Sequence, residues 1–250
     1  MLLIDLGNSR LKWRQWDGQT LGPVETVPHQ DGQLGSAFAV HLSALSNSHK
    51  ASVSCVARAQ LRDALERALD HADIESEWPA SPAHGLGLSN SYSQPERLGV
   101  DRFLALAAAY SVAGSACCVI DVGTATTVDL CDDQGIHQGG LIAPGPVPLS
   151  QALSQQTALP RAADQMPSQL GWATNTEQAL QLGALHTACG LIERSFKLAQ
   201  IQLGCEYAWL TGGGAAWLAP YLDIPLKRDD DLVFRGLILH QQETHGLDPL

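Results

Sequence analysis

The chain has 250 residues, of which 45% are hydrophobic and 16% are charged, and its formal net charge is −11. This composition is that of an ordinary folded protein and excludes a disordered chain, and the length suffices for one large domain or two of ordinary size. The acidic balance argues against a nucleic-acid-binding surface, because such a surface needs clustered Lys and Arg to neutralise phosphates.

Cysteine spacing and apolar runs argue against secretion and membrane insertion. No apolar run reaches the ~18 residues that a membrane helix needs. The N-terminus starts with a strand-like run and lacks the basic and apolar regions of a signal peptide. The cysteines form no CxxC pair and have no histidines at zinc spacing, so we expect reduced thiols and a cytoplasmic protein. They are Cys55, Cys117, Cys118, Cys131, Cys189 and Cys205.

The first half begins with a predicted β-hairpin. Residues 1–4 form a β-like run, residues 11–16 alternate apolar and polar side chains, and residues 7–10 have turn chemistry. A strand is expected over residues 51–56 and a helix over residues 59–71. Residues 79–99 are rich in Ser, Pro, Gly and Asn, which predicts mostly loop. An Ala- and Leu-rich helix should follow over residues 101–112.

The second half repeats the order of strands before helices. Strands are expected over residues 118–122, 127–131, 140–143 and 207–211. Thr174 and Glu177 have capping-box spacing ahead of a long amphipathic helix that should run to about residue 196. Three aspartates at residues 229–231 precede a last predicted helix over residues 232–242, where their charge suits the helix dipole. The pattern predicts an α/β protein with mixed sheets and two domains, residues 1–115 and 116–250.

Two segments are nearly the same. Residues 4–9 read IDLGNS, and residues 120–127 read IDVGTATT. Each is an apolar run that ends in Asp-x-Gly followed by small hydroxyl or amide residues, as when a strand brings a carboxylate to a tight turn. Exposed N–H and O–H groups at such turns can hold phosphate. Two of them predict a nucleotide held between two similar halves.

The first turn offers several phosphate-binding groups. Gly7 permits a tight turn and close approach of a ligand. Asn8 and Ser9 supply neutral donors, Lys12 supplies a compact cation, and Asp5 could hold Mg²⁺ directly or through water. The alternative is a hairpin turn of the Asx type at Asn8 that binds no ligand, with Lys12 exposed to solvent.

Three further segments complete the set of chemical motifs. The turn after Asp121 carries three hydroxyls, although a Thr-rich edge strand would look the same. Residues 99–102 read GVDR, where Asp101 and Arg102 could supply a base and a charge-neutralising cation for phosphoryl transfer; an acid at a helix start can also simply complement the dipole. The glycine-rich residues 139–145 and 211–215 are weak signals alone. No Walker A, GxGxxG or GxSxG sequence is present.

Together these segments resemble the type III pantothenate kinase family of the acetate kinase, sugar kinase, Hsp70 and actin superfamily. Residues 5–12 match DxGNSxxK, residues 99–102 match GxDR, residues 121–127 match DxGTATT, and residues 139–145 match GGxIxPG. The motifs occur in order across almost the whole chain. The family usually has an acidic residue in the last glycine motif where this chain has Gly214.

The resemblance implies two ribonuclease H-like domains per chain, a homodimer, and ATP-dependent phosphorylation of pantothenate, the first step of coenzyme A synthesis. Asp101 would be the general base, and Asp121 would anchor K⁺ or NH₄⁺. Asp5 would act through Mg²⁺, and Thr124 would contact ATP. The substrate-binding set that it implies is Tyr92, Gly99, Val100, Asp101, Arg102 and, from a partner subunit, Thr176. The implied first phosphate turn is Asp5, Leu6, Gly7, Asn8, Ser9, Arg10, Leu11 and Lys12.

Two other interpretations remain open. The first is a kinase for another small hydroxylated metabolite, such as a sugar, on the same fold. The second is a nucleotide-binding regulator without catalysis. A decayed kinase should lose its base or metal ligands first, and the chain keeps Asp5, Lys12, Asp101 and Asp121.

Overall fold

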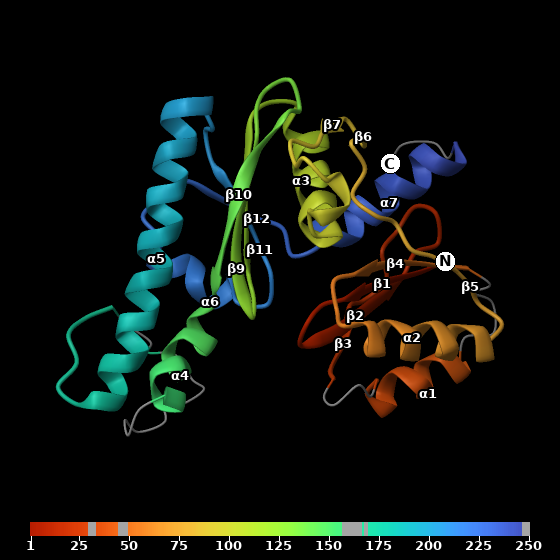
Figure 1. Ribbon diagram of the computed structural model, residues 1–250, viewed down its shortest axis with the longest axis horizontal. Coiled ribbons are helices and arrows are strands. Elements are labelled where there is room, and N and C mark those ends of the chain that lie inside the picture. Colours follow the sequence, from red (N-terminus) through yellow and green to blue (C-terminus); the bar gives the residue numbers. More distant parts are fainter. Residues whose placement is uncertain (30–33, 45–49, 157–166, 168–169, 247–250) are drawn as a thin grey trace. The chain divides into compact units, whose positions relative to one another are not determined.

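The computed structural model describes residues 1–29, 34–44, 50–156, 167 and 170–246 (Figure 1). The chain forms two compact units, each built on a five-stranded mixed sheet. The first comprises Met1–Leu86, Tyr92–Ala108 and Leu232–Leu250, and the second comprises Gly87–Ser91 and Ala109–Asp231. The expected α/β class with mixed sheets is therefore confirmed.

Both sheets have the same topology. In the first unit the strand order is β3-β2-β1-β4-β5, and in the second it is β10-β9-β8-β11-β12. In each, a three-stranded antiparallel meander is followed by two strands that run parallel to its first strand. The repeated Asp-x-Gly sequence thus marks a repeat of the whole sheet, with the motif at the end of the first strand in both copies.

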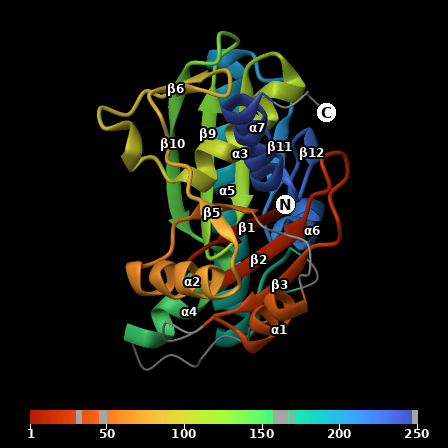
Figure 2. The ribbon, with the colours of Figure 1, turned by 90° about the vertical axis from the view of Figure 1, so that its right-hand side faces the viewer.

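The first sheet consists of β1 (Leu2–Leu6), β2 (Arg10–Gln15), β3 (Glu25–Pro28), β4 (Lys50–Cys55) and β5 (Glu75–Glu77). Side chains alternate across β1. Leu2, Ile4 and Leu6 pack with Phe38 of α1 (Ser36–Ala44) and with Leu61, Leu65 and Leu69 of α2 (Ala59–His71). Figure 2 shows α1 and α2 on one face of this sheet. Asp5 therefore belongs to the opposite face.

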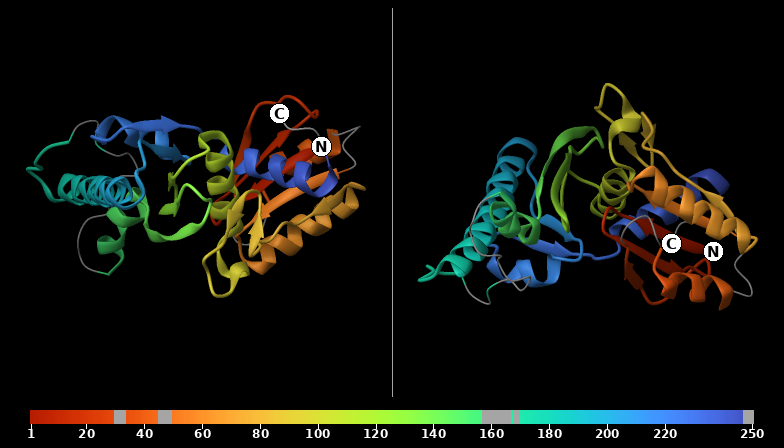
Figure 3. Two further views of the ribbon diagram at one scale, coloured as in Figure 1. Left: turned by 90° about the horizontal axis from the view of Figure 1, so that it is seen from above. Right: turned by 60° about the horizontal axis from the view of Figure 1, so that its bottom comes forward.

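The second sheet consists of β8 (Cys117–Val122), β9 (Ala125–Cys131), β10 (His137–Pro144), β11 (Ala208–Thr211) and β12 (Leu226–Arg228). One face packs on α5 (Thr176–Leu203), the long teal helix of Figure 3. Its buried side chains include Leu185, Ile192 and Phe196. Helix α4 (Pro146–Gln156) packs on α5. Cys117 and Cys118 are buried.

The remaining elements are short, with two exceptions. Helix α3 (Val100–Ala113) and helix α7 (Leu232–His245) match the helices predicted there. The loop predicted over residues 79–99 contains only β6 (His84–Gly85), β7 (Leu88–Ser89) and the 3-10 turn η1 (Pro95–Arg97). The other short elements are α6 (Ala215–Leu218) and the turn η2 (Ala219–Tyr221).

Two details of α5 differ from prediction. The cap is Asn175, whose side-chain oxygen accepts the Gln178 N–H at 2.9 Å, so the capping box expected from Thr174 and Glu177 is wrong by one residue. The helix also continues past residue 196 to Leu203. It ends there because Gly204 adopts the left-handed conformation, φ +74°, that commonly terminates helices.

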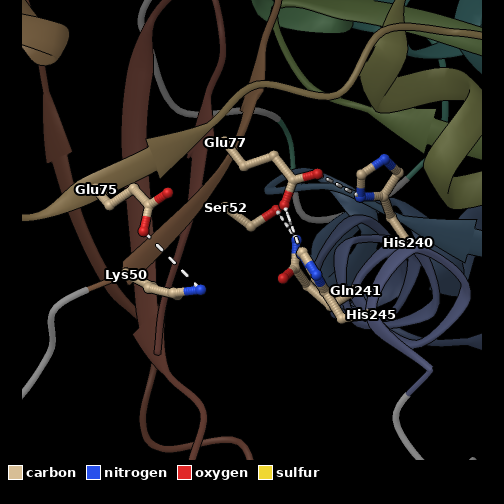
Figure 4. Close-up of polar contacts among 7 residues, drawn as sticks. All are labelled: Lys50, Ser52, Glu75, Glu77, His240, Gln241 and His245. Carbon is tan, nitrogen blue, oxygen red and sulfur yellow. Dashed lines mark hydrogen bonds and ion pairs between the residues drawn. The ribbon is translucent and has the colours of Figure 1, made fainter.

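Helix α7 returns to the first unit, where it packs on β1 and β4. Gln241 is fully buried and donates to the Ser52 hydroxyl at 3.2 Å and to a Glu77 carboxylate oxygen at 2.6 Å (Figure 4). His245 lies 3.3 Å and His240 3.7 Å from the same carboxylate. The sequence-based ranges 1–115 and 116–250 group this helix with the second half; that division stays a prediction about domains, whereas the packing of α7 is with the first sheet.

The contacts of Glu77 predict a pH-dependent contribution to stability. Burial opposes its ionisation, but hydrogen bonds from Gln241 and His245 and the nearby charges of both histidines outweigh burial and hold the pKa of Glu77 below its usual value. A carboxyl group of lowered pKa stabilises the fold above its unfolded-state pKa, and this stabilisation is lost as pH falls through the folded-state pKa.

Glu77→Gln should therefore unfold more easily than wild type near pH 7, by about 0.5 kcal/mol, since the side chain is about one third exposed. Glutamine keeps an oxygen for Gln241 and removes only the charge. The difference should narrow between about pH 5 and pH 3.5. Thermal unfolding followed by circular dichroism at several pH values measures this, and a difference that stays constant over that range would contradict it.

Candidate active site

The first Asp-x-Gly turn pairs a buried carboxylate with a lysine. Asp5 on β1 and Lys12 on β2 are register partners, and the lysine Nζ lies 3.8 Å from a carboxylate oxygen. Ser54 is the register partner of Asp5 on β4. Burial raises the pKa of Asp5, and the charge of Lys12 partly offsets this. A desolvated carboxylate beside one cation gains from a further positive charge, as a metal ion would supply.

The GVDR segment forms the start of α3. The Gly99 carbonyl accepts the Phe103 N–H at 3.1 Å, and Asp101 Oδ1 accepts the Arg102 N–H at 2.8 Å. A side chain at Gly99 would crowd Asp101 Oδ1, and it would be in van der Waals contact with the Val56 side chain. Asp101 thus has the helix-terminus role that the sequence left open, and this role fixes the direction of its carboxylate.

Cys55, the last residue of β4, has a thiol whose pKa is affected by the charges of Asp5 and Asp101. Burial raises the pKa of the Cys55 thiol, Arg62 opposes this, and the negative charges of both Asp5 and Asp101 raise it further. Cys55 is the register partner of Leu6, the residue that follows Asp5 on β1. Because the Val56 N–H donates to the Leu6 carbonyl at 3.1 Å, the ends of β1 and β4 are held together beside the start of α3. Sequence reasoning missed Cys55, and its lone position at a strand end gave no signal.

Two expected substrate-binding residues meet in the first unit. The Arg102 guanidinium donates to the Tyr92 hydroxyl at 3.3 Å, and Arg102 is only 9% exposed. The structure thus brings Tyr92, Arg102, Gly99 and Val100 together with Asp101. A buried guanidinium next to a phenol suits a small anionic ligand, because Arg binds carboxylates through its planar fork.

The second Asp-x-Gly turn lies at the end of β8. Asp121 is the register partner of Thr127 on β9 and of Thr211 on β11. The Gly123 N–H donates to the Ala125 carbonyl at 2.8 Å, which closes the turn and leaves Gly123 and Thr124 exposed. Hydroxyl-bearing residues thus flank the carboxylate on both neighbouring strands.

Both weaker glycine motifs pack against this second turn. The Gly145 N–H donates to the Thr124 carbonyl at 2.9 Å, and the Gly214 N–H donates to the Val122 carbonyl at 2.7 Å. Gly212 has φ +93°, and a side chain there would overlap Asp121 Oδ1. The three motifs of the second half therefore form one glycine cradle, in which Gly145, Gly212 and Gly214 have no room for a side chain.

Thr176 is the first residue of α5, in the second unit, and it is exposed. Its predicted contact with substrate concerns a partner subunit and stays a prediction. Buried His137 lies 3.5 Å from the Asp129 carboxylate and 3.2 Å from the Ser91 hydroxyl, which ties residues 87–91 to the second sheet.

Asp5 and the turn that follows it fit a magnesium ion that is bound together with a nucleotide. Within the described residues, no group of three or more His, Cys, Asp and Glu could hold a metal ion. One carboxylate beside a phosphate turn is the usual arrangement for Mg²⁺, which keeps several waters and phosphate ligands.

In the described part of the chain, no helix is both long and apolar enough to span a bilayer.

Comparison with known proteins agrees with this geometry. Residues 1–198 match the family model described as type III pantothenate kinase. The chain is 39% identical over 256 residues to a type III pantothenate kinase of Herminiimonas arsenicoxydans, covering 99% of this chain and 98% of that protein.

Two solved structures are similar in fold. A Baf family protein of Campylobacter jejuni has a TM-score of 0.62 at 24% identity, over 99% of this chain and 100% of that one. An inorganic polyphosphate/ATP-glucomannokinase of Arthrobacter sp. has a TM-score of 0.50 at 15% identity, over 98% and 99%. The chain thus shares the actin-like ATPase and sugar kinase fold. By its sequence, over almost its full length, the chain belongs to the type III pantothenate kinase family.

Proposed function

We propose that the chain transfers the γ-phosphoryl group of ATP directly to the hydroxyl of pantothenate, with Asp101 as general base. Membership of the type III pantothenate kinase family makes the chain a phosphotransferase of the first step of coenzyme A synthesis. The mechanism is supported by the Asp5–Lys12 pair on β1 and β2 and by Asp101 in the first turn of α3, which begins next to Val56 at the end of β4.

The acceptor side of the reaction would use the start of α3. Asp101 accepts the Arg102 N–H through Oδ1, so its carboxylate is oriented before substrate arrives. In this proposal Asp101 takes the proton of the pantothenate hydroxyl as the oxygen attacks phosphorus. Arg102 and Tyr92, which hydrogen-bond each other, would bind the pantothenate carboxylate, and Gly99 and Val100 would line the pocket.

The donor side would use the phosphate turns. The first turn (residues 5–12) would bind ATP phosphates through backbone N–H groups and Lys12, and Thr124 would contact ATP from the second turn. Magnesium, when bound, neutralises charge on the phosphates and would rest on Asp5. Burial raises the pKa of Asp5 even with Lys12 3.8 Å away, so a further cation would favour the ionised form of this carboxyl group.

Two finer features are part of the same proposal. Asp121, flanked by Thr127 and Thr211, would anchor a monovalent cation, K⁺ or NH₄⁺, next to the phosphates. The active protein would be a homodimer in which exposed Thr176 of one subunit contacts the substrate of the other.

Replacing K⁺ by Na⁺ should lower pantothenate-dependent ADP release by about tenfold or more, the effect of losing an electrostatic contact of ~1.4 kcal/mol. Asp121→Ala should lose most of the activity and respond little to the cation. A coupled ADP assay with ATP, Mg²⁺ and pantothenate measures the cation effect and the activity of the variant. The control is Asp133→Ala, in the loop between β9 and β10, which should behave as wild type. Equal rates in both salts would contradict the cation site.

The same assay separates the rival interpretations. Turnover with a sugar or another hydroxylated acceptor but not with pantothenate would indicate a different kinase on this fold. ATP binding without turnover on any acceptor would indicate the regulator.

A further inference from the structure

The carbonyl groups of the first phosphate turn are held by protein donors. Leu6 O accepts the Val56 N–H at 3.1 Å, and Arg10 O accepts the Gly7 N–H at 3.1 Å. Carbonyl oxygens repel phosphate, whereas N–H groups attract it. With the Leu6 and Arg10 carbonyls occupied by protein donors, less negative charge of the turn faces a bound anion.

His29 contacts two further carbonyl groups of this turn, those of Gly7 and Ser9. Its backbone N–H donates to Ser9 O at 3.3 Å, and its ring Nε2 lies 2.8 Å from Gly7 O. Because a carbonyl oxygen only accepts, Nε2 must carry the hydrogen in this contact. The residue is 7% exposed, so both contacts are shielded from water. His29 therefore hydrogen-bonds to the turn at two points, the carbonyls of Gly7 and Ser9.

In the second unit, the residue after the third strand of the meander also donates its backbone N–H to a carbonyl of the Asp-x-Gly turn, but this residue is Gly145. His29 directly follows β3, the third strand of the first meander, and Gly145 directly follows β10, the third strand of the second. The Gly145 N–H donates to Thr124 O, which corresponds in register to Ser9 O. Only the first turn has a side chain in this position, because at Gly145 a side chain would overlap the Gly123 carbonyl.

We propose that His29 is a positioning residue for phosphoryl transfer, which orients the first phosphate turn so that its N–H groups face the phosphates of ATP. This inference rests on the proposed function of residues 5–12 as the ATP-phosphate turn. His29 contacts no substrate in this account and acts only through the carbonyls of Gly7 and Ser9.

The decisive comparison is between His29→Leu and His29→Gln. Leucine retains bulk and the backbone N–H but has no side-chain donor, whereas glutamine has an amide nitrogen at the position of Nε2. His29→Leu should raise the KM for ATP about 3- to 10-fold, the effect of one lost hydrogen bond, with the KM for pantothenate within twofold of wild type. His29→Gln should restore most of the ATP affinity. If the leucine variant does not fold, His29→Asn, whose amide is too short to reach Gly7 O, replaces it.

A matched control is His71→Leu. The His71 ring also contacts a main-chain carbonyl, that of Arg67 at 2.6 Å, but on the exposed end of α2. It should leave the KM for ATP unchanged. Equal rises of both KM values, or no rise in His29→Leu, would overturn the role of His29. The variant Lys12→Met tests the underlying assumption separately: if it too leaves the KM for ATP unchanged, the phosphate turn itself is misassigned.

Discussion

Replacing Asp101 with asparagine should lower kcat by about 10²- to 10⁴-fold, the usual contribution of a general base. Asparagine keeps an oxygen for the Arg102 N–H, so the start of α3 should be preserved. The KM values for ATP and pantothenate should change little. Steady-state kinetics with both substrates varied measures this result.

The alanine variant separates the two roles of this side chain. Asp101→Ala should lose activity as Asp101→Asn does and also about 0.5–2 kcal/mol of stability, because the Arg102 N–H loses its acceptor. Asp63→Asn, on the exposed side of α2, is the control and should be neutral. Near-normal turnover in Asp101→Asn would show that Asp101 serves the helix terminus alone.

Replacing Gly145 with alanine should disrupt the second phosphate turn. The added carbon would overlap the Gly123 carbonyl oxygen and crowd the Thr124 carbonyl. Since backbone atoms occupy the space, the two segments must move apart and the Gly145–Thr124 hydrogen bond must lengthen. We expect a loss of about 2–4 kcal/mol of stability and a strongly raised KM for ATP. Thermal unfolding and kinetics measure both.

Gly183→Ala is the matched control for this variant. Gly183 lies within α5, and nothing lies within 4 Å of an added side chain. Alanine there should stabilise the fold by about 0.4–1 kcal/mol through higher helix propensity. If Gly145→Ala were as stable and as active as Gly183→Ala, the proposed close packing of the glycine cradle would be wrong.

Much of the fold was predictable because periodicity and turn chemistry agree along the central elements. Helix α2 has the predicted bounds, since Leu61, Leu65 and Leu69 repeat at helical spacing and are all buried. The paired strands β1–β2 and β8–β9 follow from apolar runs on either side of Asp-x-Gly turns. The elements that carry the repeated motifs were therefore visible in the sequence.

The elements that sequence reasoning missed are those specified by packing. Strands β5 and β12 have three residues each and are polar at the sheet edge, and α1 has no marked apolar face. The return of α7 to the first unit rests on contacts such as Gln241 with Ser52, which are 189 residues apart in sequence. Local sequence patterns contain no signal for such a long-range pair.

Only part of the candidate site could likewise be predicted from the sequence. The motif residues were identifiable from their chemistry, but the contacts of Cys55 and His29 with them were not, because each is a single residue at the end of a strand. The convergence of residues 139–145 and 211–215 on Asp121 also required the structure, since glycine-rich turns alone are weak signals.

The most direct test of the central claim is identification of the phosphorylated product. The protein is incubated with ATP, Mg²⁺, K⁺ and pantothenate, and the mixture is followed by ³¹P NMR. We predict a new phosphomonoester resonance, 4'-phosphopantothenate, that grows in step with ADP, requires pantothenate, and is nearly absent with Asp101→Asn. ADP formed with inorganic phosphate as the only other product, or no ADP at all, would contradict the assignment of this chain as a pantothenate kinase that uses Asp101.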